Sequence, residues 1–336
     1  MLAAWLQRQW FEQRRLTPAL WLLAPLLLPL NGLFVLGAAY KRRSTESVRL
    51  PVPVIVVGNI TVGGAGKTPL TITLTQALRE RGYRPGIVSR GYGGSNSTPR
   101  AVAVDADPAE VGDEPLLLAR HTGVPVWVGR DRAAAGQALL AAHPEVDVLL
   151  CDDGLQHYRL ARDVELAVFD RRGAGNGWRL PLGPLREPLA RLAEVDAVIS
   201  NGPVASGLAA PVPLFEMHLR PGEFHSLADA AVHCPKEAFF GKRLHAVAGI
   251  GDPQRFFNTL RGLGLSFEAH PFPDHHAYSA ADLDFGPGAV LLMTEKDAVK
   301  CSALTAAEIW VLPVVAELPP ALIDLIQEKL RGRQAA

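Results

Sequence analysis

The sequence is short of cysteine, which limits the sites that it can build from sulfur. Its three cysteines, Cys151, Cys234 and Cys301, are odd in number and far apart, so they form neither a disulfide framework nor a CxxC zinc knuckle. Cys151 lies within an apolar run and is expected to be a small core residue. This usage favours a reducing compartment.

An excess of either charge is also missing. The chain has 34 basic and 34 acidic residues, which argues against a general polyanion binder such as a nucleic-acid coat. It contains no low-complexity tract and no internal repeat. With 336 residues, 48% of them hydrophobic and 20% charged, it is expected to form about two domains of ordinary α/β composition.

Charge is absent altogether from residues 16–40, near the N-terminus. Such a run is typical of a transmembrane helix, a signal peptide, an interfacial anchor or a hydrophobic helix packed on a soluble domain. A cleaved signal would send the phosphate loop described below to a compartment without ATP, which disfavours that interpretation. The flanks within residues 1–43 are basic: Arg8, Arg14, Arg15, Lys41, Arg42 and Arg43 stand against Glu12.

Helix breakers favour the interfacial anchor. Pro25, Pro29 and the Asn31-Gly32 pair predict pieces too short to cross a bilayer, arranged as a broken hairpin that dips into the interface. Basic residues at both ends fit a hairpin with both ends on one side. We therefore predict that residues 1–45 associate with a membrane surface as a monotopic or peripheral segment. Three tryptophans suit the headgroup level: Trp5, Trp10 and Trp21.

A phosphate-binding loop follows this segment. The run PVPVIVVGN (51–59) predicts a buried strand, and residues 68–81 predict a helix with Pro69 near its start. Strand, glycine loop and helix form the context in which backbone N–H groups, a lysine and a hydroxyl bind nucleotide phosphates and Mg²⁺. Thr61 replaces the first glycine of the usual pattern. The predicted nucleotide ligands are Gly63, Gly64, Ala65, Gly66, Lys67 and Thr68.

A second strand ends in carboxylates. VDVLLCDDG (146–154) places Asp152 and Asp153 where P-loop enzymes hold Mg²⁺, although Asp-Asp-Gly also suits a surface turn. Strands at 86–90, 164–170 and 195–201 alternate with helical segments. This spacing predicts a P-loop NTPase-like α/β fold with a mainly parallel sheet and helices on both faces.

Ligands of such sheets lie beyond the carboxyl ends of the strands, which draws attention to Arg90 and Tyr92. Asp113 either caps a helix or accepts a proton from a substrate hydroxyl. His275 is predicted to orient such an acid, whereas adjacent His275 and His276 make a poor zinc site. The stretch MTEKD (293–297) only faintly resembles a base-reading NKxD motif.

The C-terminal third predicts a smaller α/β domain. Its apolar runs are separated by a helix near residues 253–264, and the joint lies near LFEMHLRPGEF (214–224). We predict four parts: the segment 1–45, a kinase domain over 46–215, the smaller domain over 216–317 and a final helix over 318–336 that packs back. If Asp113 and His275 lie in different domains, closure of the cleft would bring them together.

Taken in order, the motifs resemble those of tetraacyldisaccharide 4′-kinase, the lipid A 4′-kinase of Gram-negative bacteria. The resemblance runs from about residue 16 to about residue 300. The departure of Thr61 from the general phosphate-loop pattern is itself a feature of this family. The motifs are GNITVGGAGKTP (58–69), SRGYGG (89–94), VGDEPLLL (111–118), CDDGLQH (151–157), LPLGPLREP (180–188), FPDHHAY (272–278) and LLMTEKDAVK (291–300).

The resemblance implies transfer of the ATP γ-phosphate, with Mg²⁺, to the 4′-hydroxyl of tetraacyldisaccharide 1-phosphate at the cytoplasmic face of the inner membrane. A regulatory P-loop NTPase acting on a protein partner is the alternative, and lipid-stimulated nucleotide consumption would distinguish the two. The implied roles are phosphate and Mg²⁺ binding for Lys67 and Thr68, Mg²⁺ binding for Asp152 and Asp153, and catalytic base for Asp113 paired with His275. On the substrate side, Arg90 and Tyr92 match residues that contact the lipid sugar, and Arg186 and Glu187 match groups near the phosphates. Arg132 matches a further arginine of the site.

Overall fold

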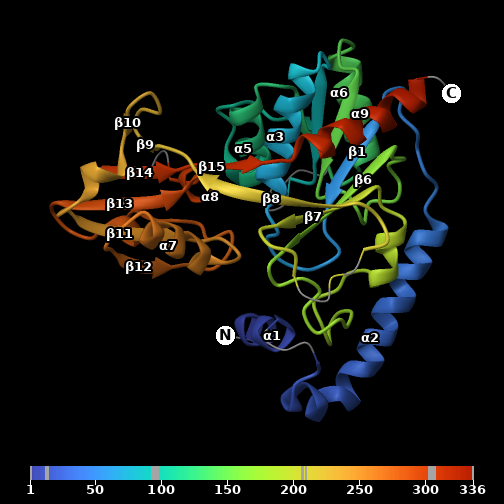
Figure 1. The fold of residues 1–336 in the computed structure, drawn as a ribbon, viewed down its shortest axis with the longest axis horizontal. Helices are drawn as coiled ribbons and strands as arrows, with labels where there is room; N and C mark the ends of the chain where they lie inside the picture. Colours follow the sequence, from blue (N-terminus) through green and yellow to red (C-terminus); the bar gives the residue numbers. More distant parts are fainter. Residues whose placement is uncertain are drawn as a thin grey trace.

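The computed structural model describes residues 2–11, 15–91, 98–205, 208, 210–301 and 308–334. Two β-sheets, each covered by helices, lie side by side, and an N-terminal helical arm runs along the larger one (Figure 1). This arrangement confirms the predicted α/β class with a mainly parallel sheet and a smaller second sheet.

The larger sheet has nine strands in the order β15-β8-β7-β6-β1-β5-β2-β4-β3. Strands β4, β2, β5, β1, β6, β7 and β8 pair in parallel, and the edge strands β3 and β15 are antiparallel to their neighbours. Its strands are β1 (Val54–Gly58), β2 (Pro85–Ser89), β3 (Arg100–Ala101), β4 (Val126–Val128), β5 (Val148–Asp152), β6 (Val164–Asp170), β7 (Ala197–Asn201), β8 (Leu214–Pro221) and β15 (Val314–Glu317).

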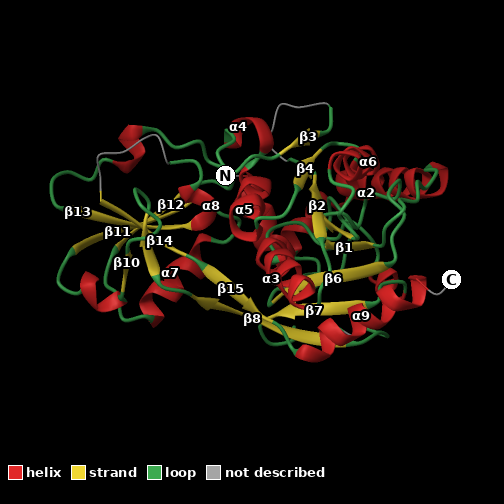
Figure 2. Cartoon of the chain, turned by 90° about the horizontal axis from the view of Figure 1, so that it is seen from above, coloured by secondary structure: helices red, strands yellow, loops and turns green. Residues whose placement is uncertain are grey.

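Both faces of this sheet are buried, because alternate residues of its apolar strands enter different cores. Ile55 and Val57 of β1 pack with α3, α5 and α9, whereas Val54 and Val56 pack with α6. Figure 2 shows these helices on the two sides of the sheet. The helices are α3 (Lys67–Glu80), α4 (Pro108–Val111), α5 (Asp113–Thr122), α6 (Arg132–Ala142) and α9 (Pro320–Gln334).

The smaller sheet has six strands in the order β10-β9-β14-β13-β11-β12. The last four strands in this order, from β14 to the edge strand β12, are parallel to one another. Phe256, Phe257 and Leu260 of α7 pack on one face. Its elements are β9 (Phe224–Ser226), β10 (His233–Cys234), β11 (Arg243–Ala248), α7 (Pro253–Gly262), β12 (Glu268–Pro271), β13 (Ala289–Thr294), α8 (Glu295–Ala298) and β14 (Glu308–Leu312), with 3-10 turns at Lys236–Phe239 and Ala280–Leu283; a further one lies at Leu189–Ala193.

Two antiparallel strands of the larger sheet connect it with the smaller one. The chain leaves along β8 and returns along β15, and Arg220 pairs with Glu317 at 2.8 Å across this ribbon (Figure 1). The predicted limits of the smaller domain, 216 and 317, therefore lie within β8 and at the end of β15. After β15, helix α9 packs on the larger sheet, where Leu322, Ile326 and Leu330 are buried.

The N-terminal arm corrects the prediction of a broken hairpin. After α1 (Leu2–Phe11), α2 is one continuous helix over Pro18–Ser44, with Pro25 and Pro29 inside it. Asn31 lies within this helix and does not form a turn. Its side-chain amide donates to the carbonyls of Arg179 and Leu180 at 2.6 and 2.9 Å. The leucines and alanines that surround the two prolines are residues of high helix propensity.

Helix α2 is apolar and largely uncovered. Within the described residues it is the one helix that is long and apolar enough to cross a membrane, a property that by itself also fits an interfacial helix. Leu20 and Ala24 are buried against the protein, whereas Leu22 is 83% exposed. Its last turn carries Lys41, Arg42 and Arg43.

Candidate active site

A cavity of about 1250 Å³ lies between the two sheets and beside α2. The phosphate loop and the ends of the parallel strands form one wall, and the loops that follow β11 and β12 form the opposite wall. A third wall comes from the second half of α2, including Phe34, Ala38, Lys41 and Arg42. One space is therefore bordered by a candidate nucleotide site and by an apolar helix.

The phosphate loop runs from β1 to the first turn of α3. Gly63 and Gly66 have φ of 98° and 92°, a left-handed conformation that favours glycine. A Cβ on Gly66 would lie 2.3 Å from Nδ2 of Asn201, whose amide donates to the Ala65 carbonyl at 3.0 Å. No described side chain caps α3, so its first N–H groups remain available for an anion.

Lys67 lies at the centre of this wall. Its Nζ is 3.4 Å from Oδ1 of Asn59 and 3.4 Å from Oδ1 of Asp153. The side chain is only 12% exposed, and Thr68 beside it also lines the cavity. A lysine held by an amide and a carboxylate is already placed where phosphate oxygens would approach the loop.

Asp152 and Asp153 follow β5 toward this lysine. Asp152 is fully buried; its Oδ1 accepts from Thr71 at 3.1 Å, and its Oδ2 is without a hydrogen-bond partner among the described residues. Burial, reinforced by the charges of Glu114 and Asp153, raises the pKa of Asp152 to about 7. A buried carboxylate oxygen without a partner fits a divalent cation, because Mg²⁺ prefers such oxygen ligands.

Asp153 differs from its neighbour. Burial alone would raise its pKa, but the charges of Lys67 and Arg186 outweigh burial and leave the pKa below its usual value. Arg186 lies 3.7 Å from Asp153 and donates to Gln156 at 3.4 Å. The two adjacent carboxyls therefore have opposite pKa shifts.

Glu187 supports this group rather than facing the cavity freely. It is 6% exposed and accepts from Gln156 at 2.6 Å and from Tyr158 at 2.5 Å. Arg132 lies behind Asp153, to whose carbonyl it donates at 3.5 Å, and burial lowers the pKa of its guanidinium.

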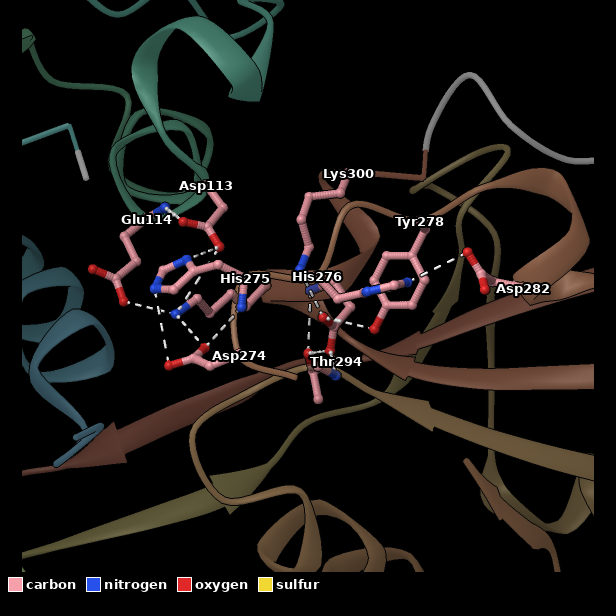
Figure 3. A network of polar contacts seen from close by, with 12 residues as sticks. Asp113, Glu114, Asp274, His275, His276, Tyr278, Asp282, Thr294 and Lys300 are labelled. Atoms are coloured by element: carbon pink, nitrogen blue, oxygen red, sulfur yellow. Dashed lines mark hydrogen bonds and ion pairs between the residues drawn. The ribbon is translucent and has the colours of Figure 1, made fainter. Parts of the chain in front are cut away.

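The side chains of Asp113 and His275 face each other in the space between the two sheets (Figure 3). Asp113 begins α5 and is 5% exposed, and its Oδ2 lies 3.0 Å from Nδ1 of His275 in the loop after β12. His275 lines the cavity and has a positive φ of 59°, which is uncommon for a residue other than glycine. His276 instead pairs with Asp282 at 3.3 Å, so the two adjacent histidines have different partners.

This pair shifts both pKa values. The hydrogen bond that the His275 ring donates to Asp113 raises the pKa of His275 against the opposing effect of burial. Burial would raise the pKa of Asp113, but His275 and the nearby Lys296 outweigh it and lower that pKa. The pair therefore favours a carboxylate beside an imidazole that binds its proton more tightly than a free histidine.

Of the two remaining predicted residues, the structure describes only Arg90. Arg90 follows β2, is exposed and lines the cavity. Tyr92 lies outside the described residues. Sequence reasoning missed Asn201, which ends β7 and holds the phosphate loop, and Arg255, which donates to Asn201 at 2.6 Å from α7. A polar residue at the end of an apolar strand was the available signal for Asn201.

The sequence model of a protein family described as Tetraacyldisaccharide-1-P 4′-kinase (LpxK) matches residues 21–331 of this chain. The chain belongs to this tetraacyldisaccharide 4′-kinase family. Membership confirms the resemblance carried by the motifs, and the match extends beyond them at the C-terminus.

Relatives called tetraacyldisaccharide 4′-kinase are similar over their whole length. That of Dechloromonas aromatica is 66% identical over 337 residues and covers 100% of both chains. That of Azoarcus sp. is 55% identical and covers 93% of this chain and 94% of its own. The crystal structure titled as the "apo" form of LpxK from Aquifex aeolicus in complex with ATP has a TM-score of 0.78 at 28% identity, over 93% of this chain and 99% of that one.

Proposed function

We propose that this chain transfers the γ-phosphate of ATP to the 4′-hydroxyl of a tetraacylated glucosamine disaccharide 1-phosphate, a step of lipid A biosynthesis. The observation that carries the proposal is the cavity itself. It is bordered by the phosphate loop, by His275 with Asp113 behind it, and by the apolar helix α2. A kinase for a lipid hydroxyl needs a nucleotide site, a proton acceptor and a lipid-facing wall around one space.

In this proposal the phosphate loop holds ATP. The N–H groups at the start of α3 and the charge of Lys67 stabilise the β- and γ-phosphate oxygens. Thr68, Asp152 and Asp153 would hold Mg²⁺, which supplies charge neutralisation on the transferred phosphoryl group. Arg186, beside Asp153, is placed to stabilise phosphate charge, while Glu187 and Gln156 hold its surroundings.

Asp113 and His275 would act on the acceptor as a unit. The imidazole lines the cavity and the carboxylate lies behind it, so His275 is the member nearer to an incoming hydroxyl. Asp113 orients the ring and stabilises its charge as the proton is taken. Arg90 and Tyr92 are proposed to contact the lipid sugar.

The acceptor would reach the cavity from the bilayer. Withdrawing acyl chains costs about 0.8 kcal/mol for each CH₂, so the enzyme must come to the lipid. Helix α2 combines exposed leucines with a basic last turn, and each basic residue near an anionic surface contributes about 1 kcal/mol. We propose a monotopic or peripheral location at the cytoplasmic face of the inner membrane, with the four predicted parts of the chain as its domains.

The direct test incubates the full-length protein in detergent with γ-labelled ATP, Mg²⁺ and tetraacyldisaccharide 1-phosphate, beside Lys67→Ala. Label should move into the lipid with the wild-type protein and not with the variant. Nucleotide hydrolysis without lipid labelling would contradict the proposal and favour a regulatory NTPase. A disaccharide already phosphorylated at the 4′ position serves as the matched control acceptor and should take no label.

A further inference from the structure

The stretch Thr294–Asp297 connects the smaller sheet with the candidate active site. It follows β13 and forms the start of α8. Asp297 is fully buried and accepts from the amide of Gly249 at 3.1 Å and from the hydroxyl of Tyr278 at 3.0 Å. Tyr278 belongs to the loop that carries His275, so its hydrogen bond to Asp297 fixes the base of that loop.

Lys296 extends from this anchor to the cavity. Its Nζ lies 3.0 Å from Oε1 of Glu114, 3.3 Å from Oδ1 of Asp274 and 4.0 Å from Oδ2 of Asp113. The side chain is 18% exposed. Burial would lower the pKa of this ammonium, but the three carboxylates outweigh burial and raise it, so Lys296 stays charged.

These contacts join parts of the chain that belong to different sheets. Glu114 and Asp113 are the first residues of α5 on the larger sheet, whereas Asp274 and His275 lie on the smaller one. The ammonium group of Lys296 therefore contacts carboxylates on both sides of the Asp113–His275 pair. Among the described residues, the charged groups that face this pair include Glu114 on α5, Asp274 in the loop after β12, Lys296 on α8 and Lys300 after it.

We propose that Lys296 is a positioning residue for the phosphoryl transfer: it clasps α5 to the His275 loop and sets the proton affinity of the Asp113–His275 pair. This inference rests on the proposed function. The positive charge disfavours protonation of both partners, so at a given pH it leaves more of the imidazole neutral and able to accept a proton. An ion pair that only stabilised the fold would leave that proton affinity unchanged.

The decisive experiment measures the pKa of His275 by NMR in full-length protein with isotope-labelled histidine. The signal is assigned among the 10 histidines by its loss in His275→Gln. Lys296→Met keeps the length of the side chain and removes its charge, so the pKa of His275 should rise by roughly one unit. Lys296→Arg should restore most of the wild-type value. Lys242→Met is the matched control, since Lys242 pairs with Glu308 on the surface of the same sheet.

Turnover gives an independent readout. For Lys296→Met, kcat at pH 7 should fall about tenfold and the acidic limb of its pH profile should move up with the pKa, with a smaller change in the KM for ATP. An unchanged pKa of His275 in a folded Lys296→Met protein would overturn the clasp, whatever its activity. Wild-type protein that fails to label the lipid would instead refute the proposed function, so the two failures are distinguishable.

Discussion

Asp152 is the residue from which a metal requirement can be tested most directly. Its unpaired buried oxygen is costly in the protein alone and useful only when a cation binds it. Asp152→Asn should therefore abolish the stabilisation by Mg²⁺ and ATP, about 2.7 kcal/mol at a hundredfold excess over Kd, without lowering the stability of the unliganded protein. Thermal unfolding with and without Mg²⁺ and ATP measures both the stabilisation by the ligands and the stability of the unliganded protein.

The control for that experiment is Asp324→Asn, whose carboxyl is 64% exposed and pairs with Arg81 on the surface. It should behave as wild type. An Asp152→Asn protein that Mg²⁺ and ATP still stabilise fully would remove Asp152 from the metal site.

The Asp113–His275 pair makes a prediction about pH. The raised pKa of His275 means that the imidazole stays protonated to higher pH than a free histidine, so the rise of activity with pH should lie above the range in which a free histidine titrates. Asp113→Asn removes the carboxylate that raises this pKa. Its turnover should fall about 10²- to 10⁴-fold, and the acidic limb of its residual activity should lie at lower pH than in wild type.

Profiles of kcat against pH for both proteins give the comparison. Asp282→Asn, which removes the partner of the neighbouring His276, is the matched control. A limb that moves upward in Asp113→Asn would mean that the carboxylate does not stabilise the charged imidazole.

Among the elements, α2 offers the clearest test of membrane binding. Leu26, Leu30 and Leu33 are 66%, 46% and 66% exposed, so replacing them by serine removes apolar contact with lipid and little packing within the protein. The triple variant should lose several kcal/mol of binding to anionic vesicles, since a buried leucine contributes about 1.5–3 kcal/mol, while its thermal stability stays unchanged. Leu20→Ala, at a buried position, should show the reverse.

Vesicle co-sedimentation in parallel with thermal unfolding separates the two effects. If the triple variant still bound vesicles as tightly as wild type, α2 would not be the membrane-binding element.

The same helix shows where sequence reasoning ended. The strands β1, β5 and β6 were predictable from their continuous apolar runs. A short apolar run favours a strand buried on both faces, because a buried helix needs a longer one. Helix α2 was predicted to break because Asn31-Gly32 is a local turn signal. Its actual role depends on the carbonyls of Arg179 and Leu180, which are far away in the sequence.

Strand β8 was predicted only as the link between the two domains, although exposed Glu216, His218 and Arg220 alternate with the more buried Met217 and Leu219, a period of two that is typical of a half-buried strand. The phosphate loop and the carboxylates after β5 could be predicted, since their neighbours in sequence define them. Asn201, Arg255 and Lys296 could not, because each acts on a segment that only the tertiary fold brings near.

The molecule as a whole closes its cavity between the two sheets, which only the β8–β15 ribbon connects along the chain. The phosphate loop touches the smaller sheet directly, because a Cβ on Gly251 would lie 4.0 Å from the Cα of Gly64. ATP and a lipid must both enter this space and leave it, so we expect the two sheets to separate in each catalytic cycle. The Gly64–Gly251 contact is a place where that motion can be blocked.

We predict that Gly64→Cys with Gly251→Cys, in a Cys234→Ser background, forms a disulfide on mild oxidation, since a Cβ on Gly251 would point at Gly64, 3.4 Å from its backbone N and 4.0 Å from its Cα. The remaining native cysteines, Cys151 and Cys301, are buried. Oxidation should stop lipid phosphorylation, and a reductant should restore it to the level of the double variant before oxidation. Each single cysteine variant should be insensitive to the oxidant. If the cross-linked protein turned over at its reduced rate, catalysis would proceed without separation of the two sheets, and the Asp113–His275 pair would stay assembled throughout the cycle.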